Sequence, residues 1–355
     1  MRELYSQIGA ELGKVNFQDI WAGFSRGEFA IYNLEKVFLK DKEVSYDKRF
    51  LGNSSIDFEG DQLAIWMVED PVKEDRKNLA ANIVHEMFHS HQYSNKESRF
   101  PNDLKGLDYP MDLRNFEIKY KENQLLVACF EDKTKEQKLD LLKEIIALRN
   151  FRKKRYGEDI SYEFLVETFE GSAEYCGTKS LKYISQTLYN ERINKYKNKL
   201  SNDIELLFDV RRLAYFTGTL FLLLLDDLNI NFTQEIEGQT ENIFDQVSKE
   251  FKNNIQTREI KDNPEIREKY KEFMLEKENK FKSFFDKEYE TKKSKALICG
   301  YDPMNMIKDK ELILCSHFIM LENKKSDETT FLKGPVVVKL EKDSLNHVIE
   351  YYELV

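Results

Sequence analysis

Two histidines one helical turn apart, with a glutamate directly after the first, are the residues of this chain best suited to chemistry. In the segment HEMFH, residues 85–89, the two imidazoles are four residues apart, so a helix would project both of them in one direction. Such a pair can hold one zinc ion, while the glutamate between them takes a proton from the attacking water. The spacing therefore predicts metal ligands at His85 and His89 and a general base at Glu86.

The residues on both sides of this motif predict that it lies on a helix. Apolar residues recur four apart in two adjoining rows, which marks the side turned to a core. These rows are Leu79, Ile83, Met87 and Ala80, Val84, Phe88. The histidines belong to a polar row at helical spacing, made of Asn78, Asn82, His85, His89 and Gln92. Because Asp70-Pro71 combines a capping carboxylate with a proline in the first turn, we expect the helix to cover about residues 71–93.

An interpretation without metal stays open, because two surface histidines hydrated by water would have the same spacing. His91 lies in another row, and we expect it to pack or to support a ligand rather than to bind the ion. Nothing near the distant His317 and His347 suggests a ligand. Catalytic zinc commonly binds three protein side chains and leaves one position for water, so a further ligand is needed.

A row of four glutamates is the best source of that ligand. Glu163, Glu167, Glu170 and Glu174 follow one another at spacings of four, three and four, which places four negative charges on one stripe of a predicted helix. Such a stripe repels itself unless a cation lies nearby. The cation could be a metal ion, or it could be Lys and Arg side chains of another helix in ordinary ion pairs.

The order of these motifs resembles that of the gluzincin metallopeptidases, the group that includes thermolysin and the aminopeptidase N family, where a glutamate on a second helix is the third zinc ligand. The segment EGSA is similar to the N-E-G-F-A segment of the aminopeptidase N family, which implies that Glu170 is this ligand. Thermolysin-like enzymes carry N-E-x-x-x-D, and Glu174 stands in the place of that aspartate, which implies that it supports one histidine. Because Glu163 and Glu167 share the stripe, the choice of the supporting carboxylate stays open.

A third segment, RRLAYFTGTLFLLLLDD, is similar to the Y-x-x-G helix of the aminopeptidase N family, where the tyrosine hydroxyl stabilises the oxyanion. The resemblance implies this role for Tyr215, with Gly218 allowing close helix packing; a tyrosine that only fills the core is the competing interpretation. The resemblance covers about residues 55–228. Within it, residues 63–68 lie where gluzincins place the edge strand that pairs with an extended substrate, although an ordinary sheet strand would read the same.

The sequence also departs from these families. About eighty residues separate HEMFH from Glu170, whereas the families usually have a short segment there. No G-x-M-E-N segment precedes the motif, so aminopeptidase activity is not supported.

Composition limits the class of protein. The 355 residues are 41% hydrophobic and 13% aromatic, which predicts a globular chain with a sizeable core. A formal net charge of -9 makes nucleic acid an unexpected principal partner. Four cysteines without a CxxC pair, an N-terminus without the apolar stretch of a secretory signal and no apolar run long enough to span a bilayer are typical of a cytoplasmic protein. The oligomeric state is not indicated.

The pattern of elements predicts an α+β fold that is predominantly helical, with a zincin-like core. We expect an N-terminal α/β part with the edge strand (1–70), a zinc-binding helical region (71–235), a charged helical segment (236–295) and a C-terminal unit containing strands (296–355). A helical pair over 114–157 ends in a basic cluster for which a solvated face is predicted. The cluster consists of Arg149, Arg152, Lys153, Lys154 and Arg155.

These observations predict a zinc-dependent metallohydrolase, and a peptidase before any other class. Zinc held by His85, His89 and Glu170 would activate water, Glu86 would accept its proton, and Tyr215 would share the developing negative charge. A peptide or protein would be the substrate, although the same groups could cleave another amide or an ester. The main alternative is a noncatalytic zinc-scaffolded module that binds a peptide or a protein, and a helical interaction protein without metal is a further one.

Overall fold

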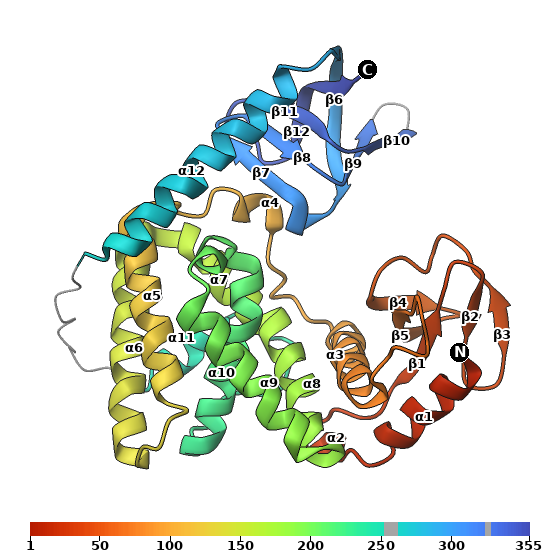
Figure 1. Cartoon of the computed structure of the whole chain (residues 1–355), viewed down its shortest axis with the longest axis vertical. Coiled ribbons are helices and arrows are strands. Elements are labelled where there is room, and N and C mark those ends of the chain that lie inside the picture. Colours follow the sequence, from red (N-terminus) through yellow and green to blue (C-terminus); the bar gives the residue numbers. More distant parts are fainter. Residues whose placement is uncertain (252–261, 324–327) are drawn as a thin grey trace.

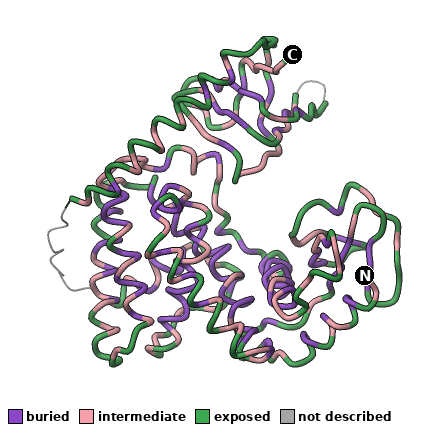
Figure 2. The backbone as a smooth tube through the Cα atoms, in the orientation of Figure 1, coloured by how far each residue is buried: buried purple, intermediate pink, exposed green. Residues whose placement is uncertain are grey.

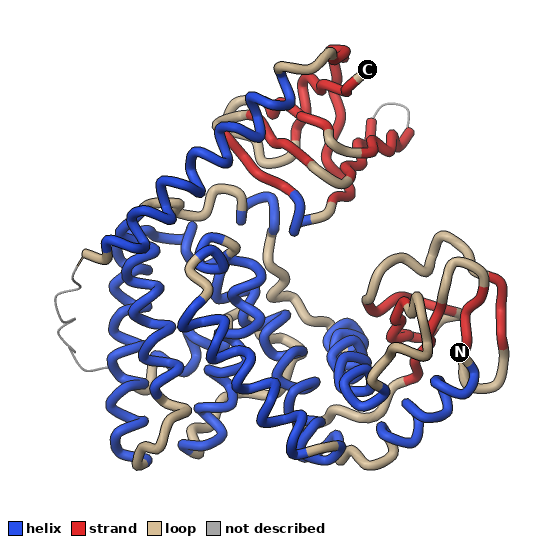
Figure 3. Tube along the Cα trace, in the orientation of Figure 1, coloured by secondary structure: helices blue, strands red, loops and turns tan. Residues whose placement is uncertain are grey.

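The computed structural model describes residues 1–251, 262–323 and 328–355. It is an α+β fold with 51% helix and 20% strand, and the strands form two separate sheets. The predicted α+β class with mostly helical content is therefore confirmed, whereas the zincin-like core stays a prediction. Figures 1 and 3 show the helices grouped in the middle of the molecule, with one sheet at the N-terminal end of the chain and the other at the C-terminal end.

The N-terminal sheet packs against the helix that carries the two histidines. Helices α1 (Arg2–Leu12) and α2 (Phe17–Ile20) precede five strands, β1 (Glu28–Tyr32), β2 (Lys36–Phe38), β3 (Glu43–Ser45), β4 (Ser54–Phe58) and β5 (Asp61–Met67). Their order is β3-β2-β1-β5-β4, with β1 and β5 parallel and the other pairs antiparallel. In β1, Phe29 and Ile31 face the main core, whereas Ala30 and Tyr32 enter a second cluster on the other face of the sheet.

The prediction that residues 63–68 form the edge strand is wrong. They belong to β5, which lies between β1 and β4, and β4 is the edge strand. A tight turn at Glu59 and Gly60, both at positive φ, folds β4 back onto β5 as a hairpin. Apolar and polar residues alternate through both strands in the sequence. The pattern therefore did not reveal the turn between them, nor that the strand before the turn lies at the edge of the sheet.

Helix α3 (Arg76–Ser94) begins five residues later than predicted. The carboxylate of Asp75 accepts hydrogen bonds from the backbone N–H groups of Lys77 (2.9 Å) and Asn78 (3.3 Å), which makes it the cap. Asp70 instead accepts from the backbone N–H of Val72 in a preceding turn. Both apolar rows of α3 are buried as predicted, and Figure 2 shows this helix as mostly buried.

The central helices enclose the largest core of the molecule. They are α4 (Asp103–Gly106), α5 (Leu113–Ala128), α6 (Lys135–Tyr156), η1 (Gly157–Ile160), α7 (Ser161–Val166), the π-helical turn η2 (Glu167–Gly171), α8 (Ser172–Ile184), α9 (Gln186–Asn202), η3 (Glu205–Phe208), α10 (Val210–Leu228) and α11 (Ile243–Ser248). The apolar run Leu220–Leu225 of α10 is entirely buried in this core. Among the described residues, no helix has the length and apolar character needed to cross a membrane.

Two members of the expected solvated basic cluster are instead among the most buried side chains. Arg149 is 1% exposed and donates to both carboxylate oxygens of Glu167, at 2.7 and 2.8 Å. Arg152 is fully buried and bonds Glu122 (2.9 Å) and Glu163 (2.6 Å). Their spacing of three residues places both on the side of α6 that packs inward, and their acidic partners come from α5, α7 and η2, which a local pattern does not show.

The C-terminal unit is a seven-stranded antiparallel sheet connected to the central helices by α12 (Pro264–Phe285). It contains β6 (Tyr289–Tyr301), η4 (Pro303–Asn305), β7 (Met306–Asp309), β8 (Leu312–Cys315), β9 (Phe318–Asn323), β10 (Glu328–Lys333), β11 (Val336–Leu340) and β12 (His347–Leu354). The strand order is β10-β9-β6-β12-β11-β8-β7. Leu104 of α4 packs into one hydrophobic cluster of this sheet, and Phe281 and Phe284 of α12 belong to another.

This unit begins at Tyr289 rather than at 296, so the predicted helical segment 236–295 extends too far. The first half of β6, residues 289–295, is exposed and carries charges on both faces. It therefore lacks the apolar alternation by which strands are recognised, although it pairs with β12.

Candidate metal centre

The three predicted metal ligands converge between α3 and η2. The Nε2 atoms of His85 and His89 are 3.1 Å apart, and Oε2 of Glu170 lies 3.8 Å from the first and 3.2 Å from the second. All three residues are buried, with exposed fractions of 8%, 7% and 6%. This burial contradicts the alternative of two hydrated surface histidines, and the donor set His-His-Glu fits zinc.

The hydrogen bonds of the two imidazoles fix which nitrogen of each ring faces the centre. Nδ1 of His85 lies 2.8 Å from Oε2 of Glu174, and Nδ1 of His89 lies 2.7 Å from Oε1 of Gln92. The Gln92 amide is oriented by its own NH₂ group, which donates to the backbone carbonyl of Phe169 at 2.9 Å. Both partners are therefore acceptors, so both Nδ1 atoms carry hydrogen and both Nε2 atoms of the neutral rings present lone pairs.

A cation is needed where these groups meet. When both rings are neutral, their two Nε2 lone pairs and Oε2 of Glu170 face one another at 3.1 to 3.8 Å, and three acceptors without a donor repel one another. Either a proton or a divalent ion relieves this repulsion. Carboxylate and amide groups behind the ligands, which fix ring orientation in this way, are characteristic of protein metal sites.

A close crossing of α3 and α8 holds the histidines in place. A Cβ atom at Gly177 would lie 2.7 Å from the backbone oxygen of Ala81 and 3.3 Å from Cβ of His85, so this contact requires glycine. A second close approach joins η2 to α10, where a Cβ at Gly171 would lie 2.8 Å from Cα of Gly218. The predicted packing role of Gly218 is therefore confirmed: it lets α10 pack closely against η2, the turn that carries Glu170.

The π-helical turn explains how one predicted stripe of glutamates serves two purposes. A π turn inserts about one extra residue, which rotates the following residues by roughly 100° relative to an uninterrupted α-helix. Glu163 and Glu167, before or at its start, pair with the buried cations of α5 and α6. Glu170 and Glu174 face the two histidines of α3 instead. The ion-pair interpretation is therefore confirmed for Glu163 and Glu167. A metal ion beside Glu170 and Glu174 stays a prediction.

Arg211 of α10 is a residue of this site that the sequence analysis missed. One of its nitrogens donates to Oε1 of Glu170 at 2.8 Å, and another bonds Asp103 of α4. Burial raises the pKa of Glu170, but the histidines and Arg211 outweigh it and hold that pKa well below its usual value. The carboxylate is therefore ionised and has Oε2 available for the ion. Arg211 lies one helical turn before Tyr215, which was already expected in the site. This spacing could have indicated that Arg211 lies near the same cavity.

Glu86 and Tyr215 line the same cavity as the ligands. The cavity has a volume of about 350 Å³, and its wall consists of Asn53, Ser54, Trp66, Asn82, His85, Glu86, His89, Tyr93, Phe169, Glu170, Glu174 and Tyr215. Among the described residues, none hydrogen-bonds or pairs with the carboxylate of Glu86, whose pKa is raised chiefly by burial. The ring of Tyr215 lies parallel to the imidazole of His85, with centroids 6.0 Å apart, and burial raises its pKa so that its hydroxyl stays protonated.

The other three histidines take no part in this centre. His91 packs between Phe24 and Phe88, and its Nδ1 lies 3.1 Å from the amide nitrogen of Asn95. His317 and His347 lie on the C-terminal sheet, where they pair with Asp302 and Glu341.

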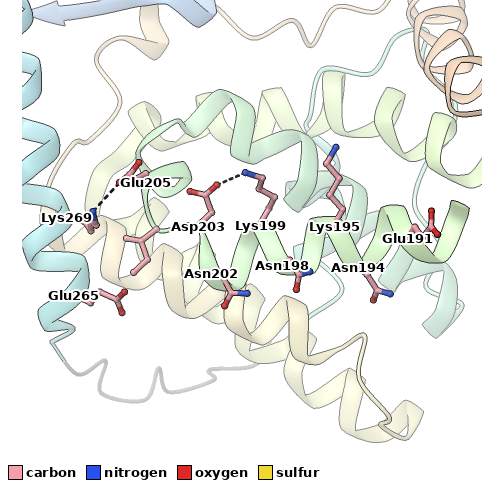
Figure 4. A pocket seen from close by; sticks show the side chains of 11 residues that line it. Glu191, Asn194, Lys195, Asn198, Lys199, Asn202, Asp203, Glu205, Glu265 and Lys269 are labelled. Atoms are coloured by element: carbon pink, nitrogen blue, oxygen red, sulfur yellow. Dashed lines mark hydrogen bonds and ion pairs between the residues drawn. The ribbon is translucent and has the colours of Figure 1, made fainter. Parts of the chain in front are cut away.

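A larger cavity, of about 850 Å³, lies along α9 and near the start of α12 (Figure 4). Four of its charged side chains already pair with each other: Lys199 with Asp203 at 2.7 Å and Lys269 with Glu205 at 3.2 Å. It contains no histidine and no buried acid–base pair, so we place the chemistry in the smaller cavity.

Comparison of the chain with models of protein families, with curated proteins and with solved structures finds no match. The assignment of the site therefore depends on its geometry and on the motifs in the sequence.

We expect metal binding to release a proton from His85. Burial lowers the pKa of this imidazole, but Glu170 and Glu174, which accept hydrogen bonds from the protonated ring, outweigh burial and raise it to about 10. At neutral pH the metal-free ring is therefore protonated, and zinc affinity should fall about tenfold for each unit of pH lost. Calorimetric titration with zinc in buffers of different ionisation enthalpy should count about one proton released. The absence of proton release between pH 7 and 8 would contradict the arrangement.

The same shift predicts how the metal-free fold responds to pH. Because the pKa of His85 is raised above the ordinary value of 6.5, the protonated ring stabilises the folded state fully below pH 6.5. This contribution should be lost as pH rises toward 10. Thermal unfolding of the metal-free protein and of the variant His85→Gln, measured between pH 6.5 and 10, would test this prediction. Only the unsubstituted protein should lose the stability that the protonated His85 ring contributes.

Proposed function

We propose that this chain is a zinc-dependent hydrolase, and specifically a peptidase with a zincin-like core. The observation that carries the proposal is the convergence of two imidazole nitrogens and a carboxylate oxygen beside an unpaired glutamate in one cavity. A structural zinc site is normally closed by four protein ligands, whereas three are found here among the described residues. Three ligands and a nearby base favour catalysis over a scaffold.

The residues would divide the work as follows. Zinc bound by His85, His89 and Glu170 would supply a Lewis acid that lowers the pKa of water and polarises a carbonyl group. Glu86 would accept a proton from the attacking water and return it to the leaving amine, for which its raised pKa is suitable. Tyr215 would donate a hydrogen bond from its protonated hydroxyl to the oxygen on which negative charge develops.

A peptide substrate is favoured by the strand that borders the cavity. Ser54, the first residue of β4, and the preceding Asn53 both line it, and β4 is the edge of its sheet. An extended peptide could therefore add to the free edge of β4 by backbone hydrogen bonds while it crosses the cavity. A second cavity, of about 630 Å³, lies next to this one, since Asn82, Glu174 and Tyr215 line both.

Removal and return of the metal test the proposal. Protein purified without added zinc should contain about one zinc ion per chain, and a chelator should abolish hydrolysis of a peptide library that zinc then restores. Binding should also stabilise the fold by about 4 kcal/mol at a free zinc concentration one thousand times the Kd. The variants His85→Ala and His89→Ala should neither bind zinc tightly nor gain this stability.

Two results would contradict the proposal, each in a different way. A protein that binds no zinc under any condition would exclude both the enzyme and the zinc scaffold. A protein that binds zinc at these residues but hydrolyses neither the peptide library nor denatured proteins would favour the noncatalytic peptide-binding alternative.

A further inference from the structure

Three aromatic rings extend the wall of the metal cavity past the C-terminal end of α3. Phe169 of η2 stacks on the imidazole of His89, with ring centroids 4.7 Å apart. Phe100, in the loop after α3, lies 5.0 Å from Phe169, and Tyr93 of α3 lies 5.8 Å from Phe100 in a stacked arrangement. The rings therefore form a continuous aromatic surface that begins at a predicted metal ligand.

The outer part of this surface is exposed. Tyr93 and Phe100 each have an exposed fraction of 41%, whereas Phe169 has 6%. A single exposed apolar side chain is ordinary, but stacked rings beside a cavity form a joined patch of the kind that marks ligand-binding grooves. Tyr93 and Phe169 line the cavity directly, as does Trp66 of β5. The ring of Phe100 contacts the rings of Tyr93 and Phe169.

The charges around these rings select among possible occupants. No lysine or arginine lines this cavity, whereas Glu86, Glu170 and Glu174 do, so an acidic side chain would be repelled. The carboxylates of Glu170 and Glu174 are already engaged by Arg211 and by the histidines. Only Glu86 could therefore attract a cationic side chain, and Glu86 lies on α3 beside the metal ligands rather than among the three rings. A neutral ring or a large aliphatic group loses no charge interaction and buries apolar surface on both sides.

We infer that Tyr93, Phe100 and Phe169 form a subsite that binds a large apolar side chain, preferably an aromatic one, of a peptide residue next to the bond that is cleaved. This inference rests on the proposed function and names its substrate class. Burying such a side chain contributes about 1.5–3 kcal/mol relative to leaving it exposed, which corresponds to an affinity about ten- to a hundredfold higher than for alanine.

Binding can be measured without catalysis. Zinc-loaded Glu86→Gln protein would be titrated with fluorescein-labelled ten-residue peptides of glycine, serine and alanine, in which one phenylalanine occupies each position in turn. At one position, phenylalanine should bind at least tenfold more tightly than alanine, lysine or glutamate. Adding Tyr93→Ala or Phe100→Ala should reduce this ratio to about threefold or less, whereas Tyr93→Phe, which retains the ring, should preserve it.

Phe151→Ala is the matched control. Phe151 is a similarly exposed ring, at 40%, but it lies on α6 and outside the cavity, so its removal should leave the ratio unchanged. Circular dichroism and zinc content would show whether each variant is folded, and Phe100→Leu offers a milder change should Phe100→Ala not fold. The inference is overturned if phenylalanine has no advantage at any position, or if its advantage survives loss of the Tyr93 and Phe100 rings.

The inference and the proposed function fail in distinguishable ways. Hydrolysis by the unsubstituted protein with equal kcat/KM for peptides containing phenylalanine, alanine or lysine would reject the aromatic subsite and keep the enzyme. A protein that hydrolyses nothing, but still prefers the phenylalanine peptide through Tyr93 and Phe100, would keep the subsite and reject the enzyme.

Discussion

Replacing Glu86 by glutamine is expected to lower kcat/KM for peptide hydrolysis by about 10²- to 10⁴-fold, which is the usual contribution of a general base. Glutamine has nearly the same shape but cannot accept the proton. Because no described residue pairs with the Glu86 carboxylate, the substitution should leave the fold and the zinc ligands unchanged. Steady-state kinetics of both proteins at equal zinc content measures the effect.

The exposed Glu69, which follows β5 and lies outside the cavity, gives a matched control. Glu69→Gln makes the same chemical change without touching the site, so its kcat/KM should stay within about twofold of the unsubstituted protein. Activity of Glu86→Gln within threefold of the unsubstituted protein would mean that another group accepts the proton, and the role proposed for Glu86 would be wrong.

The second large effect concerns stability. Arg152→Met should lower the free energy of unfolding by about 3–5 kcal/mol, because it leaves buried carboxylates without their partner. Arg152 is fully buried and bonds both Glu122 and Glu163. Burial raises the pKa of Glu163, but Arg152 and Lys119 outweigh burial and hold this pKa well below its usual value. Urea denaturation followed by circular dichroism gives the free energy.

Arg155, exposed on the same helix, provides the comparison. Arg155→Met should change the free energy of unfolding by no more than about 0.5 kcal/mol. The double variant Arg152→Met with Glu163→Gln should recover part of the loss, since it removes one of the unpaired charges. A cost below 1 kcal/mol for Arg152→Met would show that the buried ion-pair network does not hold α6 against α5 and α7.

The convergence of the two histidines was predictable because its geometry is local. The spacing of four residues places His85 and His89 on one side of any α-helix, and the apolar rows beginning at Leu79 and Ala80 identify the side that is buried. The same periodicity placed Gln92 in the row of the histidines, and its amide now orients the ring of His89. None of these relationships depends on a residue distant in the sequence.

Other features were visible only in part. The glutamate stripe showed that cations must lie nearby, but whether each was a metal or an arginine depended on the π turn at 167–171 and on side chains of α5 and α6. Arg149 and Arg152 stood in a charged run that resembles a solvated surface, and only their acidic partners on other helices make burial favourable.

The sequence by itself determined that the two imidazoles lie together with Glu86 on one buried helix, and it determined the α+β class, since each follows from periodicity or composition over a short stretch. Only the tertiary structure decided that Glu170 faces these histidines, that β4 rather than β5 lies at the edge of the sheet beside the cavity, and that Arg211, Tyr93 and Phe100 gather around the site. The reason is physical: these relationships join residues far apart along the chain, and helix crossings at glycines, a hairpin and a π turn set them.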